Sequence, residues 1–137
     1  MNDKDKELLL QDLCGRLPYK VICECSPINF RGTLGEISRV YEMCRLFDDF
    51  SDENVFIYDC KPYLFPLSSM TEEQREEYES LCIKETSDCT DLYGIIFTKD
   101  YYYNTIESIE FLYKNHIDIR GLIPKGLAID CTGLNIY

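Results

Sequence analysis

The stretch between residues 19 and 67 is a succession of short β-favouring segments, and this constrains the fold more than any other feature. Residues 19–25 alternate, with Tyr19, Val21, Cys23 and Cys25 on one side of an extended chain, which is the pattern of a half-buried strand. Further short runs follow at regular intervals and are separated by glycines, prolines or acidic residues. This spacing predicts four or five short strands with tight connections.

Glycines and prolines refine the prediction for this stretch. Two glycines within residues 30–37 favour a bent or bulged strand. Residues 40–47 and 55–60 are further β-favouring runs, and the prolines within residues 61–67 require an extended chain because proline disfavours helix before it. We therefore predict a small, strongly bent antiparallel sheet, or an SH3-like or OB-like barrel.

Three helices are predicted outside this stretch. Residues 3–14 form an amphipathic helix, for which Gly15 is predicted to be the C-cap. A second helix begins at a capping box, in which the side chains of Thr71 and Gln74 bond to each other's backbone amides. A third helix begins near Thr105, where a polar residue precedes an apolar helical pattern.

The remaining segments complete an α+β fold. Residues 84–91 are polar and are predicted to be a loop, whereas residues 92–103 and 127–131 alternate and are predicted to be extended. We predict a bent antiparallel sheet or barrel with about three packed helices in a single domain. Its three parts are the N-terminal helix at residues 1–17, a β-rich part at residues 19–67, and a helical and mixed part at residues 71–137.

Negative charge is concentrated in two segments of the chain. The chain has 25 acidic residues against 14 lysines and arginines, a net charge of −11. Residues 42–60 hold six acids and one base, and residues 71–91 hold eight acids and two bases, so the rest of the chain sums to zero. A field of this sign repels phosphate backbones and argues against direct nucleic-acid binding.

The same field attracts basic surfaces. The sequence therefore predicts a protein partner with a basic surface, steered by the acidic residues of the two segments. A solvated surface that only aids solubility is the alternative interpretation. The acidic residues predicted to bind are Glu72, Glu73, Glu76, Glu77, Asp48, Asp49 and Asp52.

Aromatic residues supply a second candidate binding surface. The chain has eleven tyrosines and no tryptophan. Tyr101, Tyr102 and Tyr103 are consecutive, and successive side chains of an extended segment point to opposite sides. At least one of the three is therefore predicted to be exposed, where tyrosine is enriched at binding surfaces.

His116, Asp118 and Arg120 form the only cluster with the appearance of a catalytic site. A histidine titrates near neutral pH and a carboxylate can orient it, while an arginine can hold a phosphate or carboxylate. The structural alternative is that His116 lies at the C-terminus of the preceding helix. Asp118 and Arg120 would then hold the turn to Gly121 through hydrogen bonds.

The eight cysteines indicate no disulfide framework and no metal site. No C-x-x-C pair is present and His116 is the only histidine, so we predict no metal and no cofactor. Most cysteines lie in apolar runs and are predicted to be small buried side chains. The sequence contains neither a membrane-spanning stretch nor a signal-peptide core, which predicts a cytoplasmic protein with no membrane association.

Three segments carry a resemblance to a known set of proteins: residues 13–19, 59–73 and 118–130. They resemble small uncharacterised proteins of Bacteroides-type gut bacteria and of their phages and prophages. The resemblance is weak between residues 30 and 54 and between residues 84 and 104. Related chains often have two histidines and an aromatic residue just before Asp118, where this chain has Asn115, His116 and Ile117. The resemblance implies an accessory protein of a mobile element, and it carries no activity.

Three hypotheses about function follow. The first is a non-enzymatic, acidic protein-interaction module of phage or prophage origin, for example an inhibitor of a host nucleic-acid-handling or defence protein. The second is a small enzyme that uses His116, Asp118 and Arg120. The third is a barrel that binds single-stranded nucleic acid through exposed aromatic residues.

Overall fold

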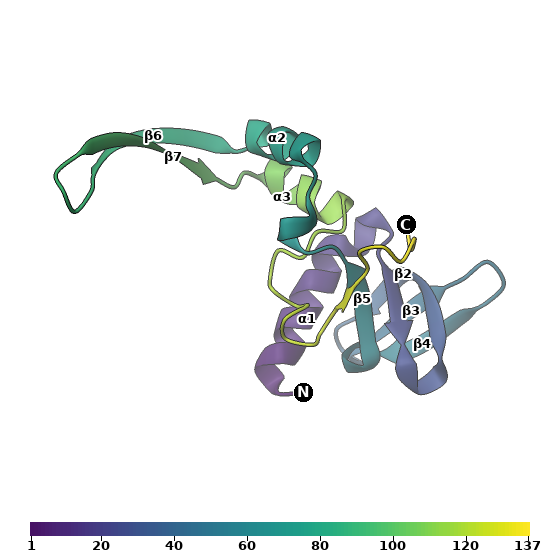
Figure 1. Cartoon of the computed structure of the whole chain (residues 1–137). Coiled ribbons are helices and arrows are strands. Elements are labelled where there is room, and N and C mark those ends of the chain that lie inside the picture. Colours follow the sequence, from purple (N-terminus) through teal and green to yellow (C-terminus); the bar gives the residue numbers. More distant parts are fainter. The chain divides into compact units, whose positions relative to one another are not determined.

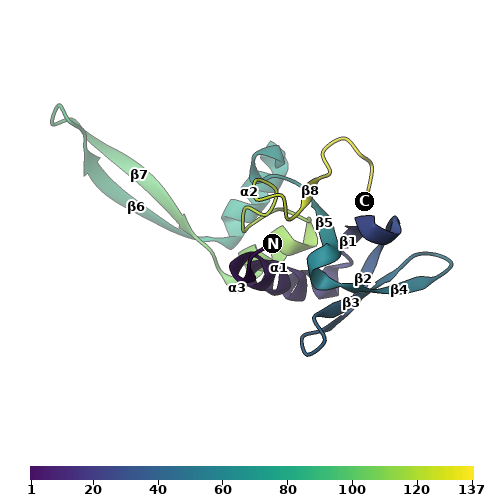
Figure 2. The ribbon, with the colours of Figure 1, turned by 90° about the horizontal axis from the view of Figure 1, so that it is seen from below.

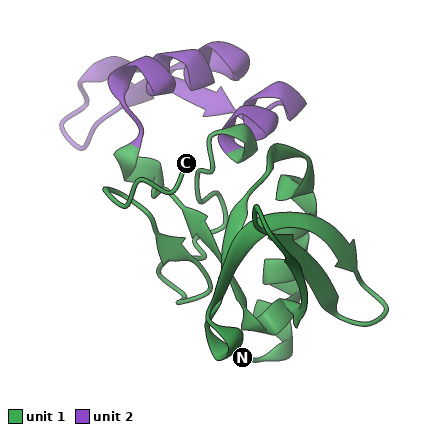
Figure 3. Cartoon of the chain, turned by 90° about the vertical axis from the view of Figure 1, so that its right-hand side faces the viewer, with its two compact units in different colours: residues 1–69, 113–137 green, residues 70–112 purple.

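The chain divides into two compact units (Figure 3). The structure is a computed structural model that describes residues 1–137. Unit 1 consists of Met1–Ser69 and Tyr113–Tyr137, and unit 2 consists of Met70–Leu112. Unit 2 is thus an insertion between two segments of unit 1.

The predicted α+β class is confirmed, with three α-helices, a six-stranded sheet and a separate hairpin (Figure 1). Short 3-10 helices connect several of these elements. The helices and strands are α1 Asp3–Arg16, β1 Ile22–Cys25, β2 Phe30–Ser38, β3 Met43–Phe47, β4 Asp52–Phe56, β5 Cys60–Leu64, α2 Glu72–Leu81, β6 Ile83–Thr90, β7 Ile96–Tyr103, α3 Ile106–Lys114 and β8 Ile129–Asp130.

The sheet of unit 1 is mixed and open. Its strand order is β4-β3-β2-β1-β5-β8, and Figure 2 shows these strands in a second view. Consecutive neighbours from β4 to β5 are antiparallel, but β8 pairs with β5 in parallel. The prediction of an antiparallel sheet is therefore confirmed for five strands but not for β8. The predicted SH3-like or OB-like barrel is not found. Barrel closure requires the two edge strands to pair, whereas here β4 and β8 form opposite edges.

The β-rich stretch follows its predicted pattern only in part. The strand predicted from residue 19 begins at Ile22, because Leu17–Tyr19 is a 3-10 helix. In place of the strand predicted at residues 55–60, the structure has β4 at Asp52–Phe56 and a 3-10 helix at Ile57–Asp59. Val21, Cys23 and Cys25 are all buried, as the alternation predicted. The register between β2 and β3 shifts between Leu34 and Glu36, which confirms the predicted bulge. The predicted strand at residues 40–47 is shorter, because residues 39–42 form a turn before β3.

A single hydrophobic core lies in unit 1. It joins one side of α1 to the sheet and to the segment that leads into β8. Four of its side chains are cysteines, which confirms their predicted role as small buried groups, and all eight cysteines are free. The core side chains are Leu9, Leu13, Val21, Cys23, Cys25, Leu34, Cys44, Leu46, Val55, Ile57, Cys60, Leu64, Leu122, Leu127 and Ala128.

Helix α1 begins as predicted but continues past its predicted end. The Asn2 side chain accepts a hydrogen bond from the amide of Asp5 at 2.8 Å, which caps the helix N-terminus. The prediction that Gly15 is the C-cap is wrong, since the helix runs to Arg16. Gly15 instead provides space, because a Cβ atom there would lie 2.6 Å from the Tyr113 ring.

In unit 2, two helix starts are confirmed and one predicted loop is wrong. Thr71 and Gln74 form both bonds of the predicted capping box. Helix α3 begins after Thr105, whose hydroxyl accepts from the Ser108 amide at 3.1 Å. Residues 84–91, predicted to be a loop, belong mostly to β6, which pairs along its whole length with β7. Cross-strand pairing stabilises this strand although its own sequence is polar.

Candidate functional site

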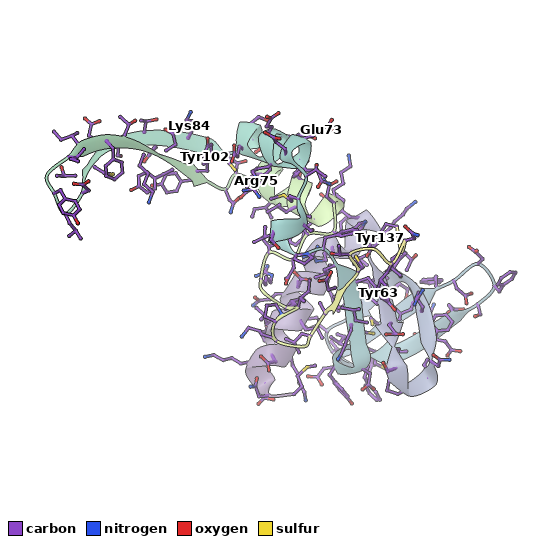
Figure 4. The ribbon with its side chains drawn as sticks, viewed as in Figure 1. Tyr63, Glu73, Arg75, Lys84, Tyr102 and Tyr137 are labelled. Atoms are coloured by element: carbon purple, nitrogen blue, oxygen red, sulfur yellow. The ribbon has the colours of Figure 1, made fainter.

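Unit 2 contains most of the negative charge of the protein. Its 43 residues include eleven acids and three bases, a balance of −8 out of the total of −11. Five of the acids lie on α2, where the only base is Arg75. Figure 4 labels Glu73 and Arg75 on this helix. The two acidic segments predicted from the sequence therefore belong to different units.

The acidic face of α2, formed by Glu72, Glu73, Glu76 and Glu77, is exposed and unneutralised within the chain. The spacing of these four residues places them on one side of the helix. Glu72 and Glu76, and likewise Glu73 and Glu77, are four residues apart, a spacing at which like charges destabilise a helix by about 0.2–0.5 kcal/mol per pair. No ion pair of the structure includes a residue of α2. This face therefore presents four negative charges that no ion pair within the chain neutralises.

The acidic residues of unit 1 differ from those of α2, because most of those predicted to bind a partner make contacts within the chain. Asp48 accepts hydrogen bonds from the amides of Phe50 and Ser51 at 2.8 and 2.6 Å, and these bonds lower the pKa of its carboxyl group. Asp52 lies 3.3 Å from Arg45, which neutralises it. Asp49 is exposed and lies beside a hollow of about 570 Å³ that also contains Lys20. Two of the three carboxylates predicted to bind a partner thus already have partners inside the chain.

The β6–β7 hairpin extends from the helices of unit 2 as a two-stranded arm (Figure 1). All of its strand residues are exposed except Cys89 and Tyr101, which are half-buried. Lys84 and Tyr102 lie opposite each other near its base, as Figure 4 shows. A hairpin with both faces in water gains little from apolar burial and depends on cross-strand contacts.

Cross-strand polar contacts hold the two strands of the hairpin together. The hydroxyl of Thr86 donates to Asp100 at 2.7 Å, and Lys84 lies 3.4 Å from the same carboxylate. Within β7, Lys99 lies over the ring of Tyr101, with 5.2 Å between its nitrogen and the ring centroid, inside the roughly 6 Å limit of a cation–π contact. These contacts fix the hairpin without covering its apolar side chains.

Hydrogen bonds also anchor the base of the hairpin to α2 and α3 within unit 2. The Thr105 hydroxyl donates to the carbonyl of Leu81 at 2.6 Å, which joins the end of α2 to the start of α3. Tyr78 donates to the side chain of Asn104, and its ring packs 6.4 Å from that of Phe111. The arm therefore begins from a fixed base.

The three consecutive tyrosines lie on β7. Tyr102 and Tyr103 are exposed, while Tyr101 is half-buried beside Cys89, with its hydroxyl 3.8 Å from the sulfur. Because side chains alternate along a strand, Tyr101 and Tyr103 share one face of the hairpin and Tyr102 lies on the other. Both faces of the arm thus present an aromatic side chain to water.

The tip of the hairpin, residues 91–96, contains exposed apolar side chains that the sequence analysis missed. Leu92, Tyr93, Ile95 and Ile96 are all exposed. A usable signal was present, since an aspartate and a glycine three residues apart, at positions 91 and 94, are typical of a hairpin turn. The polar sequence of β6 concealed the strand on one side of this turn.

The structure does not assemble His116, Asp118 and Arg120 into a catalytic triad. Both oxygens of Asp118 accept backbone hydrogen bonds, from Leu122 at 2.9 Å and from Ile123 at 3.0 Å, so they hold the following turn. Arg120 donates to the hydroxyl of Tyr113 at 3.1 Å. Neither group is available to orient the histidine.

His116 lies at the end of α3 in a left-handed conformation, with φ of 59°. Its ring stacks on that of Tyr137, with ring centroids 3.6 Å apart. Burial, together with the positive charge of Arg16, lowers the pKa of His116 to about 4. A general base works best with a pKa near the working pH, so this histidine is a weak base near neutrality.

The pKa of His116 predicts a loss of stability in mild acid. Its folded-state pKa of about 4 lies below the ordinary value of 6.5, so the unfolded chain binds the proton more readily. The stabilising effect of the neutral ring is therefore complete above pH 6.5 and is lost as the pH falls towards 4. Between pH 7 and pH 5, we expect about 1 kcal/mol of extra loss in the free energy of unfolding, allowing for partial exposure of the ring.

Urea unfolding at the two pH values measures this loss. The control is His116→Asn, because asparagine tolerates the left-handed conformation and does not titrate. This variant should lose about 1 kcal/mol less than the wild-type protein between pH 7 and pH 5. Equal losses in the two proteins would show that His116 does not cause the acid sensitivity.

Asp12 and Arg16 form a second charged cluster that the sequence analysis missed. Both are fully buried, and Arg16 donates to Asp12 through Nε at 2.7 Å and through Nη2 at 3.2 Å. Arg16 also donates to the carbonyl of Ile117 at 2.6 Å. The cluster ties α1 to the chain that follows α3.

Comparison with known proteins gives no match: no family model, no curated protein and no solved structure is significantly similar to this chain. No three histidine, cysteine, aspartate or glutamate side chains are grouped so that they could hold a metal ion. No helix has both the length and the apolar character needed to cross a bilayer. The interpretation of function therefore depends on the acidic face of α2 and the hairpin arm.

Proposed function

We propose that the protein is a non-enzymatic interaction module that binds a basic protein partner through unit 2. The observation that carries this proposal is the acidic face of α2, whose four exposed glutamates have no cation partner in the chain. Glu72 and Glu73 lie in the first turn, where the helix dipole favours them, but Glu76 and Glu77 lie beyond that turn and repel them, so helix stability alone does not explain the second pair. An acidic surface of this kind accelerates and orients the docking of a basic partner.

The resemblance to proteins of gut bacteria and their phages suggests a setting for this activity. In that setting, the module would be an accessory protein of a mobile element that inhibits a host nucleic-acid-handling or defence protein. Proteins that handle nucleic acid have basic surfaces for the phosphate backbone, and an acidic module competes for such a surface. The inhibitor hypothesis is supported by the negative charge of unit 2 and by the resemblance to proteins of phages and prophages.

Charge also disfavours the third hypothesis, direct binding of single-stranded nucleic acid. The hollow of unit 1 contains Lys20 and Arg31, two members of the only basic concentration in the sequence. Asp48 and Asp49 line the same hollow and cancel these charges. A phosphate backbone would therefore gain little from this surface.

A capture experiment tests the proposed function. The bait is the tagged protein in a Bacteroides-type lysate, compared with a variant in which Glu72, Glu73, Glu76 and Glu77 are all replaced by glutamine. For the captured partner, we expect the variant to bind about 10- to 100-fold more weakly at low salt, because each exposed charge pair contributes about 0.2–1 kcal/mol. Isothermal calorimetry with the purified partner measures this difference.

A matched control separates the acidic face of α2 from acidity in general. Glu42→Gln, Asp49→Asn, Glu53→Gln and Asp59→Asn remove the same number of charges from unit 1 and should leave the affinity within about threefold. The wild-type affinity should also fall as ionic strength rises, since salt screens exposed charges. The proposed function would be refuted by a partner that binds with the same affinity at low and high salt. It would also be refuted by a partner that binds the four-glutamine variant of α2 as tightly as the wild-type protein.

A further inference from the structure

We propose that the hairpin tip, residues 91–96, is the anchor with which the protein docks into an apolar cleft rimmed by lysine and arginine on its partner. This inference rests on the proposed function and specifies how the partner is held. The acidic face of α2 supplies long-range attraction to basic surfaces, and the tip supplies the short-range contact.

Hydrogen bonds hold the tip in one conformation. The Asp91 carboxylate accepts from the amides of Tyr93 and Ile95, at 2.8 and 2.9 Å. The backbone amide of Asp91 donates to the carbonyl of Ile95 at 3.0 Å, and that of Gly94 donates to the carbonyl of Asp91 at 3.1 Å. Gly94 has a φ of 79°, which glycine adopts without strain. A loop fixed in this way loses little conformational entropy on binding.

The side chains displayed by this rigid tip are apolar. Leu92 is fully exposed and Tyr93 is 89% exposed, while Ile95 and Ile96 are 60% and 72% exposed. A turn needs only its aspartate and glycine, and polar residues would serve at the other positions. Four neighbouring apolar side chains at the end of an arm are an exposed patch of the kind that marks binding sites. Among these side chains, Tyr93 is of the type most enriched among the energetically dominant residues of protein interfaces.

The charge of unit 2 identifies the chemistry of the occupant. Asp91 lies in the tip itself and Asp88 lies on the strand behind it, and residues 83–103 hold four acids against two bases. A second copy of the chain would bring an equal negative charge to the contact, and an anionic membrane would repel the arm. A cleft rimmed by lysine and arginine complements the tip in both polarity and charge.

The test uses a library of random twelve-residue peptides displayed on phage, selected against the immobilised wild-type protein. The variant Leu92→Ser/Tyr93→Ser removes two anchors without changing charge. Its matched control, Val40→Ser/Phe50→Ser, removes two exposed apolar side chains from turns of unit 1, where they are 87% and 97% exposed. The selected peptides are synthesised, and their affinities for all proteins are measured by fluorescence anisotropy.

We expect the selected peptides to combine apolar residues with a net positive charge. Their affinity should fall at least about 30-fold for the tip variant and stay within about threefold for the control variant, as for the loss of interface anchors. Circular dichroism spectra of the variants should match that of the wild-type protein, since the substituted side chains are exposed. Equal peptide affinity for the tip variant and the wild-type protein would overturn the inference.

The remaining outcomes separate this inference from the proposed function. Basic peptides that lose affinity only with the four-glutamine variant of α2 would uphold the proposed function and refute the role of the tip. Peptides that need the tip but lack positive charge would overturn the inference without contradicting the proposed function, which depends on the acidic face of α2. Concentration-dependent dimerisation, or binding to phosphatidylcholine vesicles, would also overturn the inference if either is abolished by Leu92→Ser/Tyr93→Ser.

Discussion

Replacing Asp12 with asparagine is expected to lower the free energy of unfolding by about 3–5 kcal/mol, because it leaves the buried guanidinium of Arg16 without a counterion. Asparagine has nearly the same shape as aspartate, so the loss arises from charge rather than from a cavity. Both side chains of this pair are completely buried, and Nε of Arg16 lies 2.7 Å from the carboxylate. Urea unfolding at pH 7 measures the change.

The position of the pair explains the size of this effect. The guanidinium of Arg16 lies 5.0 Å from the centre of the Tyr113 ring and also bonds to the carbonyl of Ile117. Arg120 lies 3.7 Å from Asp12 on another side. Burial raises the pKa of Asp12, and the hydrogen bond from Arg16 opposes this shift. An uncharged residue at position 12 leaves two arginines near each other with no anion between them.

An exposed ion pair on the same helix is the matched control. Glu7 lies 3.6 Å from Arg39, with side chains that are 48% and 78% exposed. Glu7→Gln should change the free energy of unfolding by less than about 1 kcal/mol, because water solvates both charges. Replacing the buried pair together, as Asp12→Leu/Arg16→Met, should recover most of the loss caused by Asp12→Asn. If Asp12→Asn cost no more than Glu7→Gln, the buried pair would not be a determinant of stability.

Local signals in the sequence predicted local structure well. The capping box at Thr71 and Gln74 forms as predicted, since both of its bonds lie within four residues of chain. The burial of Val21, Cys23 and Cys25 follows directly from alternation along one strand. Such features depend on near neighbours, so a single sequence contains the information needed to predict them.

Features that depend on distant contacts could not be predicted in the same way. Strand β6 has a polar sequence, and it forms because β7 supplies partners such as Asp100 for Thr86. The parallel pairing of Tyr63 with Ile129 joins segments that are far apart in the chain. The open edges of the sheet, and hence the absence of a closed barrel, follow from that pairing. No pattern within either segment shows which segment it will meet.

The candidate site was predicted in part. The acidic glutamates of α2 were identified from composition, because charge is visible in a sequence without any contact. The apolar tip was missed, since apolar residues are usually buried and only the hairpin shows that Leu92 and Tyr93 are not. The buried pair of Asp12 and Arg16 was also missed, although its spacing of four residues places it on the same helix side as Leu9.

Gly15→Val is expected to lower the free energy of unfolding by about 2–3 kcal/mol, by forcing atoms into a space that Tyr113 occupies. A Cβ atom at position 15 would lie 2.6 Å from one carbon of the ring and 2.7 Å from the hydroxyl oxygen. The ring cannot move easily, because it is 8% exposed and its hydroxyl accepts from Arg120 at 3.1 Å. Thermal and urea unfolding measure the loss.

A glycine at position 15 lowers the stability of the helix, so its presence indicates a need for space beside the Tyr113 ring. Glycine within a helix costs about 1 kcal/mol relative to alanine, so its presence inside α1 indicates that space is needed there. The matched control is Gln11→Val at an exposed position of the same helix, where the lower helix propensity of valine and the loss of the hydrogen bond from Gln11 to Glu7 together cost about 1 kcal/mol or less.

A double-mutant cycle assigns the loss to the contact between the two residues. In a Tyr113→Leu background, Gly15→Val should cost at least about 1 kcal/mol less than in the wild-type protein, because leucine does not reach the position of the ring hydroxyl. An unchanged cost would show that the glycine is required for the backbone of α1 rather than for packing. The expected coupling would show that close packing at Gly15 holds α1 to Tyr113 at the end of α3, in addition to the bond from Arg16 to the carbonyl of Ile117.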